Sequence, residues 1–426
     1  MLAFCVVAIV LPLGVGLYLN RINATPVVNI PAPPKAPNPN GYDLYVAAAT
    51  AMTCFKPEVD PASDTTLVTD PKVRAQRYGL ARRTAWLNAN KKAFALFNQA
   101  LKTPALAPPS RSFYATFPSY AKLRQLARDK SAQSNTLWMR GDYNGAIQSN
   151  LDTVQLGHDM RRGGVLITTL VGIAIGALGR GNTGDTIERL NAAQCKSAAR
   201  RMEKLLANRW RLDQALTEEK WATQAGLMEV FGQQGWRTDF FGGDIPMRER
   251  WLIYTVPKQR VVDNVGAIYD REIANARLPF TNKGAPPLQF NDPFSEVLNG
   301  GLDRSRINEA RGLMGDRTLM LQLALRAYKL ENGAYPPSLK ALVPAYLSAV
   351  PADPFGGGEP LRYKRSGVTY VLWSIGPDGR DDGGKPIPPR VGSRRPKNFP
   401  GERPRGPRSF TDFEGKGDVV AGVNTG

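Results

Sequence analysis

Apolar residues recur at a spacing of three to four positions over most of residues 41–276, and this period constrains the fold more strongly than any other feature. Short stretches of Gly, Pro and Asn separate the periodic segments, so each segment is expected to form one helix. We therefore predict an all-α bundle over residues 42–300. Its helices are expected over residues 43–54, 70–100, 119–134, 142–161, 164–178, 183–231 and 247–276.

Three segments inside this bundle need separate interpretation. Gly141–Ile147 resembles half of a tetratricopeptide hairpin with Asp142 as the helix cap, and because one copy is visible it predicts a hairpin rather than a repeat array. The apolar run over residues 165–178 is too short to cross a bilayer, so we predict a fully buried central helix. The glycine-rich residues 176–184 lack the Lys-Ser/Thr pair that grips phosphate, and they predict a loop.

The pattern changes after residue 303. One more helix is expected to end at Gly333, because glycine readily adopts the left-handed conformation of a helix C-terminus. Two segments of β-branched and aromatic residues follow, over 361–364 and 368–374, with a short Ser-Gly turn between them. Residues 303–384 therefore predict a small α+β domain built from a helix and an antiparallel hairpin.

This domain resembles the soluble part of the type II secretion major pseudopilin and related pilin-like domains. The resemblance implies a helix laid on a small antiparallel sheet with a terminal loop, and it covers under a fifth of the 426 residues. The whole chain is also similar to uncharacterised exported proteins of planctomycete-type bacteria. The pseudopilin resemblance rests, in chain order, on Tyr328-Lys-Leu-Glu-Asn-Gly-Ala-Tyr-Pro336, Leu339, Leu342, Tyr346-Leu347, Val350-Pro-Ala-Asp-Pro-Phe-Gly356, Tyr370–Ser374 and Ile375-Gly-Pro-Asp-Gly379.

The chain begins with an apolar segment. Residues 2–19 have about the length that a bilayer crossing needs, so we predict a transmembrane anchor over residues 1–20. The alternative is a cleaved signal peptide, with Ala24 as a small residue near a cleavage point. Either interpretation exports the rest of the chain. The expected localisation is the bacterial inner (cytoplasmic) membrane, with the bulk of the chain in the periplasm or at the cell surface.

Two proline-rich segments flank the folded part. Residues 21–41 predict a stiff extended linker between the membrane and the helical domain. Residues 385–426 are rich in Pro, Gly and Arg, have few apolar groups, and predict a disordered basic tail. With a formal net charge of +19, the chain can contact anionic polymers through this tail. No sequence motif for nucleic-acid recognition accompanies the tail, so nucleic acid is not expected as a partner.

The composition leaves few groups for catalysis. His158 is the only histidine, and we interpret it as a packed or capping residue, because helical spacing places no carboxylate on its face. Glu218 and Glu219 are adjacent, and adjacent helical residues do not face one another, so a solvated face is expected. The cysteines allow at most one disulfide, between Cys54 and Cys195.

The pseudopilin resemblance implies one metal site. Major pseudopilins hold calcium in the terminal loop with backbone oxygens and aspartates, and Asp378 matches the aspartate of the Gly-Pro-Asp-Gly motif. Asp381 and Asp382 add charge, although the family's later aspartates are spaced differently. Calcium needs six to eight oxygen ligands, which the neighbouring glycine carbonyls can help to supply. The alternative is an Asp-Gly turn whose carboxylates accept hydrogen bonds from local amides.

These features favour a membrane-anchored cell-envelope scaffold or interaction protein that is not an enzyme. It would contact the membrane through residues 2–19 and bind protein partners, with the secretion or envelope association that the resemblance implies. Two alternatives remain. One is an exported enzyme with an acid/base site among His158, Glu218 and Glu219, which a deep polar pocket joining them would favour. The other is a charge-driven binder of anionic envelope polymers.

Overall fold

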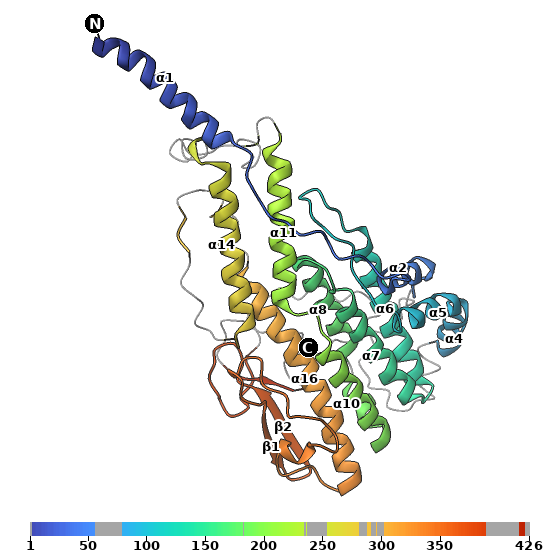
Figure 1. Cartoon of the computed structure of the whole chain (residues 1–426). Coiled ribbons are helices and arrows are strands. Elements are labelled where there is room, and N and C mark those ends of the chain that lie inside the picture. The colour runs from blue at the N-terminus through green and yellow to red at the C-terminus, as the bar shows by residue number, and fades with distance from the viewer. Residues whose placement is uncertain are drawn as a thin grey trace.

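A computed structural model describes most of the chain, and helices dominate it. A three-stranded antiparallel sheet lies near the C-terminus. In Figure 1, α1 (Leu2–Asn23) projects from one end of an elongated body and the sheet lies at the other end. The predicted combination of a helical body with a small antiparallel sheet is confirmed. The described residues are 2–55, 79–181, 183–233, 236, 254–280, 288–290, 295, 302–388 and 417–421, with the backbone alone for 2–12 and 303.

The first helix touches the body at its C-terminal end. The Tyr18 hydroxyl donates a hydrogen bond of 3.0 Å to the carbonyl of Thr255, and Ile22 is buried. A search of the described residues finds no helix with the length and apolar character that crossing a membrane requires. The side chains of residues 2–12 lie outside the described part, so the anchor at residues 1–20 stays a prediction.

Helices α2 to α14 form the body. Most lie within the predicted ranges, although the long segments 70–100 and 183–231 each divide into shorter helices. Asparagines mark two of the breaks, because their side chains compete with the helix for backbone hydrogen bonds. Asn90 bonds to the backbone of Thr53, and Asn191 starts α10 with a capping box. The helices are α2 (Gly41–Ala51), α4 (Leu80–Ala89), α5 (Lys91–Ala100), α6 (Pro118–Met139), α7 (Tyr143–Asp159), α8 (Leu166–Arg180), α9 (Gly184–Ile187), α10 (Ala192–Ala207), α11 (Leu212–Phe231) and α14 (Lys258–Arg277).

The hairpin of α6 and α7 begins its second helix where the sequence predicts. Asp142 is the N-cap of α7, and its side chain accepts a hydrogen bond of 2.8 Å from the backbone N–H of Gly145. Ala146 and Ile147 are fully buried, as expected for packing positions of a helical hairpin. The predicted cap is therefore confirmed.

Helices α7 and α8 approach one another very closely because glycines line their contact. A Cβ atom at Gly157 would lie 2.5 Å from the carbonyl oxygen of Gly172, and one at Gly179 would lie 2.7 Å from that of Asn150. The predicted loop over residues 176–184 is therefore wrong in its first part, since Gly176–Arg180 continue α8. Glycine lowers helix propensity, and the close packing of the two backbones offsets that loss.

Helix α8 is not fully buried, which corrects the prediction from its apolar sequence. Ile167 and Leu178 are 45% and 37% exposed, whereas Thr168, Thr169 and Ile175 are buried. The buried face is the one that carries the small residues, because it meets the backbone of α7. One apolar face of α8 therefore reaches the surface in the described part of the molecule.

The C-terminal unit starts with α16 (Asp303–Asn332), which ends at Gly333 with a φ of 78°. A short 3-10 helix, η1 (Leu339–Leu342), leads to β1 (Arg362–Ser366) and β2 (Thr369–Ser374). The two strands pair antiparallel, with Arg362 opposite Trp373, and Gly367 in the turn has a φ of 56°. Both the helix end and the hairpin are as predicted.

A third strand corrects the prediction of a disordered tail over residues 385–426. β3 (Val419–Val420) is buried and pairs antiparallel with β2. The carboxylate of the fully buried Asp418 accepts hydrogen bonds from the backbone N–H groups of Gly384 and Lys385, at 2.7 and 3.2 Å. The prediction is wrong for residues 385–388 and 417–421, whereas residues 389–416 and 422–426 lie outside the described part.

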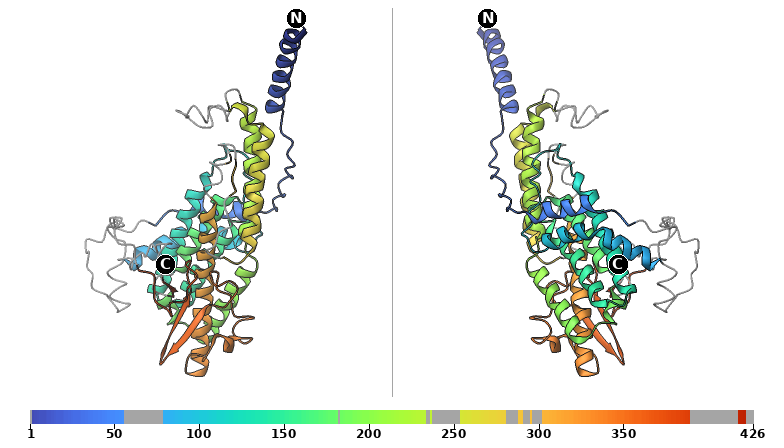
Figure 2. Two further views of the ribbon diagram at one scale, coloured as in Figure 1. Left: turned by 90° about the vertical axis from the view of Figure 1, so that its left-hand side faces the viewer. Right: turned by 90° about the vertical axis from the view of Figure 1, so that its right-hand side faces the viewer.

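One apolar core spans the boundary between the two predicted domains, 42–300 and 303–384. Figures 1 and 2 show α10 and α16 side by side, with the sheet next to α16. Burying apolar side chains from both sides of the boundary joins the two units. The shared core includes Leu151 of α7, Cys195 and Met202 of α10, Leu321 and Leu325 of α16, Leu342 of η1, and Tyr346, Leu361 and Leu372 around the sheet.

We predict that a methyl group at the α7–α8 contact destabilises the fold. In Gly157→Ala, the new Cβ meets backbone atoms of α8, so the helices must move apart. The free energy of unfolding is expected to fall by about 1–3 kcal/mol, measured by denaturant unfolding. Gly184→Ala is the matched control, because a Cβ there meets nothing within 4 Å. Equal losses in the two variants would contradict the close-packing account.

Candidate functional site

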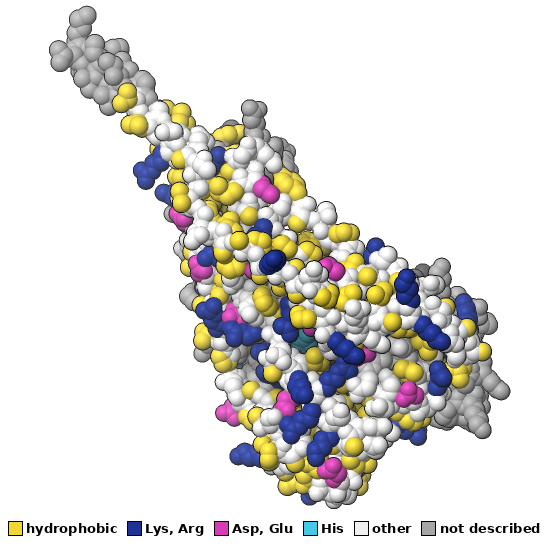
Figure 3. Space-filling view, turned by 45° about the vertical axis from the view of Figure 1, so that its right-hand side comes forward, with side chains coloured by type: hydrophobic (Ala, Val, Ile, Leu, Met, Phe, Trp, Pro, Cys, Tyr) yellow, Lys and Arg dark blue, Asp and Glu magenta, His cyan; other side chains and the backbone are white. Residues whose placement is uncertain are grey.

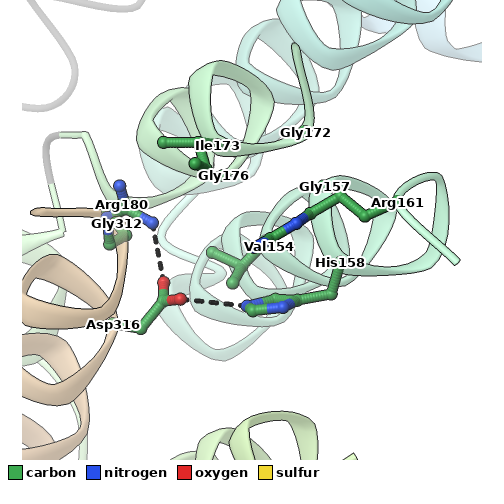
Figure 4. Close-up of a pocket in the computed structure, with 10 residues that line it drawn as sticks. All are labelled: Val154, Gly157, His158, Arg161, Gly172, Ile173, Gly176, Arg180, Gly312 and Asp316. Atoms are coloured by element: carbon green, nitrogen blue, oxygen red, sulfur yellow. Dashed lines mark hydrogen bonds and ion pairs between the residues drawn. The ribbon is translucent and has the colours of Figure 1, made fainter. Parts of the chain in front are cut away.

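A small hollow lies where α7, α8 and α16 meet (Figure 4). Its free volume is about 10 Å³, which is roughly the room that one water molecule needs. Glycines form much of the wall, and four ionisable side chains extend toward the space. Figure 3 shows the single histidine at the bottom of a depression on the surface, with Lys and Arg side chains around it. The lining residues are Val154, Gly157, His158, Arg161, Gly172, Ile173, Gly176, Arg180, Gly312 and Asp316.

Asp316 of α16 is the centre of this site. One carboxylate oxygen lies 2.9 Å from Nε2 of His158, and the other accepts a hydrogen bond of 2.7 Å from Nη1 of Arg180. Burial raises the pKa of Asp316. The charges of Arg180 and His158 and the hydrogen bonds from both side chains lower it by a larger amount, so the resulting pKa is about 2. Asp316 is therefore ionised at neutral pH. Because an ionised carboxylate only accepts hydrogen bonds, Nε2 of His158 is the nitrogen that carries a proton.

His158 is packed, as predicted, but it also has a carboxylate partner that the sequence pattern does not reveal. The histidine is 5% exposed, and Asp316 lies 158 positions further along the chain. Helical spacing can report only partners on the same helix, and here the partner comes from α16. The only local signal was an aspartate among the apolar residues of α16.

A second buried ion pair lies beside the first. Arg161, in the turn after α7, donates a hydrogen bond to the carboxylate of Glu309 on α16. Arg161 and Glu309 are 3% and 7% exposed. The two pairs, Arg161 with Glu309 and Arg180 with Asp316, tie the first half of α16 to α7 and α8.

Glu218 and Glu219 do not form the solvated face that was predicted. Glu218 is 7% exposed and pairs with Arg111 at 3.2 Å. Glu219 accepts a hydrogen bond of 2.7 Å from the backbone N–H of Leu166, at the first turn of α8. Burial raises the pKa of Glu219, and that hydrogen bond lowers it in part. Glu218, Glu219 and His158 each have a different partner, so the structure does not bring them together as one acid/base site.

The carboxylates of the predicted calcium loop accept hydrogen bonds from the protein. Asp378 accepts from the backbone N–H groups of Arg380 and Gly417, at 3.1 and 3.3 Å. Asp381 accepts a hydrogen bond of 2.9 Å from the indole of Trp373, and this bond is the main cause that lowers the pKa of Asp381. Asp382 is exposed. Among the described residues, no group of three or more His, Cys, Asp or Glu side chains is placed to hold a metal ion.

The calcium site therefore remains a prediction that rests on the pseudopilin resemblance. The geometry of Asp378 and Asp381 matches the alternative interpretation, in which the carboxylates bond to nearby amides. The two described cysteines do not form the disulfide that the sequence allowed: Cys54 is exposed and Cys195 is buried in the shared core. Burial raises the pKa of Cys195 to about 12, so its thiol stays protonated at neutral pH.

Comparisons of the chain with protein-family models, curated proteins and solved structures find no match. The resemblances to pseudopilins and to planctomycete-type exported proteins therefore stay predictions from the sequence.

We predict that Asp316→Asn destabilises the protein strongly at neutral pH. The substitution removes the carboxylate and leaves the largely buried charge of Arg180 without its partner. Breaking one side of a buried pair costs about 3–5 kcal/mol of unfolding free energy, measured by denaturant unfolding. Asp270→Asn is the matched control, because Asp270 pairs with Lys220 while its side chain is 62% exposed. An exposed pair contributes only about 0–1 kcal/mol.

The same variant has an expected pH dependence. A carboxylate whose pKa is lowered by folding stabilises the folded state above its unfolded pKa, which is about 4. That contribution is lost as the pH falls from about 4 toward the folded pKa of Asp316, about 2. The stability difference between the natural protein and Asp316→Asn should therefore narrow over this window. A difference that stays constant down to pH 2 would contradict the ionised pairing.

Proposed function

We propose that the protein is a membrane-anchored scaffold of the bacterial cell envelope that acts through interactions and not through catalysis. In this proposal the helical body carries a pilin-like C-terminal unit in one fixed orientation. The observation that carries the proposal is the continuity of α16 across both units. Its first half is tied to α7 and α8 through Asp316 and Glu309, and its second half packs under the sheet.

Rigidity is the property that supports a scaffold role. Units joined by small polar contacts move relative to one another, whereas a large apolar interface prevents that motion. The core around Leu321 and Leu325 of α16 includes side chains from α7, α10 and the sheet, so it belongs to neither unit alone. The C-terminal unit, joined in this way, keeps a fixed distance and direction from the end of the body that carries α1.

The arrangement of the two ends suits a tethered protein. Figures 1 and 2 place α1 at one end of the body and the sheet at the other. With α1 in the inner membrane, the sheet would lie away from the bilayer on the exported side, where we propose that protein partners bind. Within the described part of the chain, β1 pairs on one side only, with β2. Unpaired strand edges are common sites for the addition of a partner strand.

The alternative of an exported enzyme has one observation in its favour. His158 lines the hollow and is held by an aspartate, and within the described part of the chain its Nδ1 atom has no hydrogen-bond partner. However, small-molecule sites have volumes of about 300–1,000 Å³, and the free volume here is about 10 Å³. The hollow has no room for a substrate molecule, so we prefer the scaffold.

The anchoring part of the proposal predicts that the full chain binds to lipid vesicles without help from charge. We would use vesicles of neutral phosphatidylcholine, because the net charge of +19 would bind any anionic surface. The full chain should float with the vesicles in a density gradient, also at 0.5 M salt, which screens charge (roughly a 4 Å Debye length). A variant that lacks residues 2–23 should stay at the bottom. A full chain that fails to float would contradict the anchor.

A further inference from the structure

The hollow between α7, α8 and α16 holds more hydrogen-bond donors than acceptors. Three buried nitrogen atoms of the lining residues have no hydrogen-bond partner in the described part of the chain: Nδ1 of His158, Nε of Arg161 and Nε of Arg180. A guanidinium Nε always carries a hydrogen, and Nδ1 becomes a third donor when the imidazole is protonated. The one carboxylate that lines the hollow is Asp316, and both of its oxygens are already bonded. Buried donors without a partner are rare in proteins and costly.

Two further arginines lie close to the ion pairs, although neither of them lines the hollow. In the described part of the molecule, Arg209 and Arg317 form no ion pair and donate to the carbonyls of Leu206 and Ala352. Burial and the nearby charge of Arg161 lower the pKa of Arg209. Burial and the charge of Arg209 do the same for the pKa of Arg317. Positive charges held together in a partly buried region attract an anion.

We infer that this hollow is a binding site for one small anion, either a halide ion or one oxygen of an oxyanion such as phosphate. The free volume of about 10 Å³ admits one such atom, and Arg161 and Arg180, which both line the hollow, each carry a buried Nε–H that has no partner among the described residues. Gly157, Gly172 and Gly176 line the hollow and have no side chains that could fill it. The anion is bound where the three helices meet. This inference does not depend on the proposed scaffold function.

A variant that fills the hollow without changing any charge tests the inference. In Gly312→Ala, the three atoms nearest to the new methyl group all belong to Ile173, with the nearest carbon at 3.3 Å, so the chain should fold. Gly184→Ala is the control, because its methyl group meets no atom within 4 Å. All three proteins carry the same charges, so general screening by salt affects them equally.

The first measurement is the Tm of the full chain in increasing sodium chloride and, separately, in increasing sodium phosphate at pH 7. A site that only the folded state offers should raise the Tm by about 2 °C or more once the anion is in excess. The natural protein and Gly184→Ala should show this rise, and Gly312→Ala should not. The salt that produces it identifies the ligand as a halide or an oxyanion. Identical responses of all three proteins to both salts would overturn the inference.

Calorimetric titration with inorganic phosphate and with chloride gives an independent readout. The anion that raises the Tm should bind the natural protein at one site, and Gly312→Ala should bind it at least tenfold more weakly. If Gly312→Ala does not fold, Gly176→Ala replaces it, because its methyl group meets only the flexible end of Arg180, at 3.1 Å. Absence of binding to the natural protein by either anion would show that the hollow holds water alone, and would overturn the inference.

Discussion

The carboxylate of Asp316 is the contact on which the arrangement of three helices depends. It accepts from His158 at the end of α7 and from Arg180 at the end of α8, while its own helix, α16, continues under the sheet. A buried charge that loses a partner is costly, so these side chains favour one rotation and one position of α16 along its axis. The second pair, between Arg161 and Glu309, favours the same rotation and axial position of α16.

These ion pairs are able to form because α7 and α8 lie unusually close together. Gly157, Gly172 and Gly179 remove the side chains that would hold the two backbones apart, and His158 and Arg180 then lie on the same side of the pair. Buried ion pairs contribute little net stability by comparison with apolar packing. We therefore assign the stability of the assembly to the core shared by α7, α10, α16 and the sheet, and its alignment to the charges.

Local features of the sequence predicted local structure well. Helical periodicity located most of the helices, Gly333 marked the end of α16, and the alternation over residues 361–374 predicted the hairpin. The site could not be predicted in this way, because His158 and Asp316 are 158 positions apart and no period connects them. The hydrogen bond from Leu166 to Glu219 also joins residues that are far apart in sequence, by 53 positions, and Glu219 is half-buried where a solvent-exposed glutamate was expected. The glycines of α8 predicted a loop because glycine disfavours helices, and only the neighbouring backbone of α7 explains them.

The central claim is that the helical body and the C-terminal unit form one cooperative structure. Differential scanning calorimetry of the full chain tests it most directly, because it counts the units that unfold independently. The account predicts one transition over both units, with a calorimetric enthalpy equal to the van't Hoff enthalpy. Two separate transitions, or a calorimetric enthalpy about twice the van't Hoff value, would mean that α16 does not join the units as described.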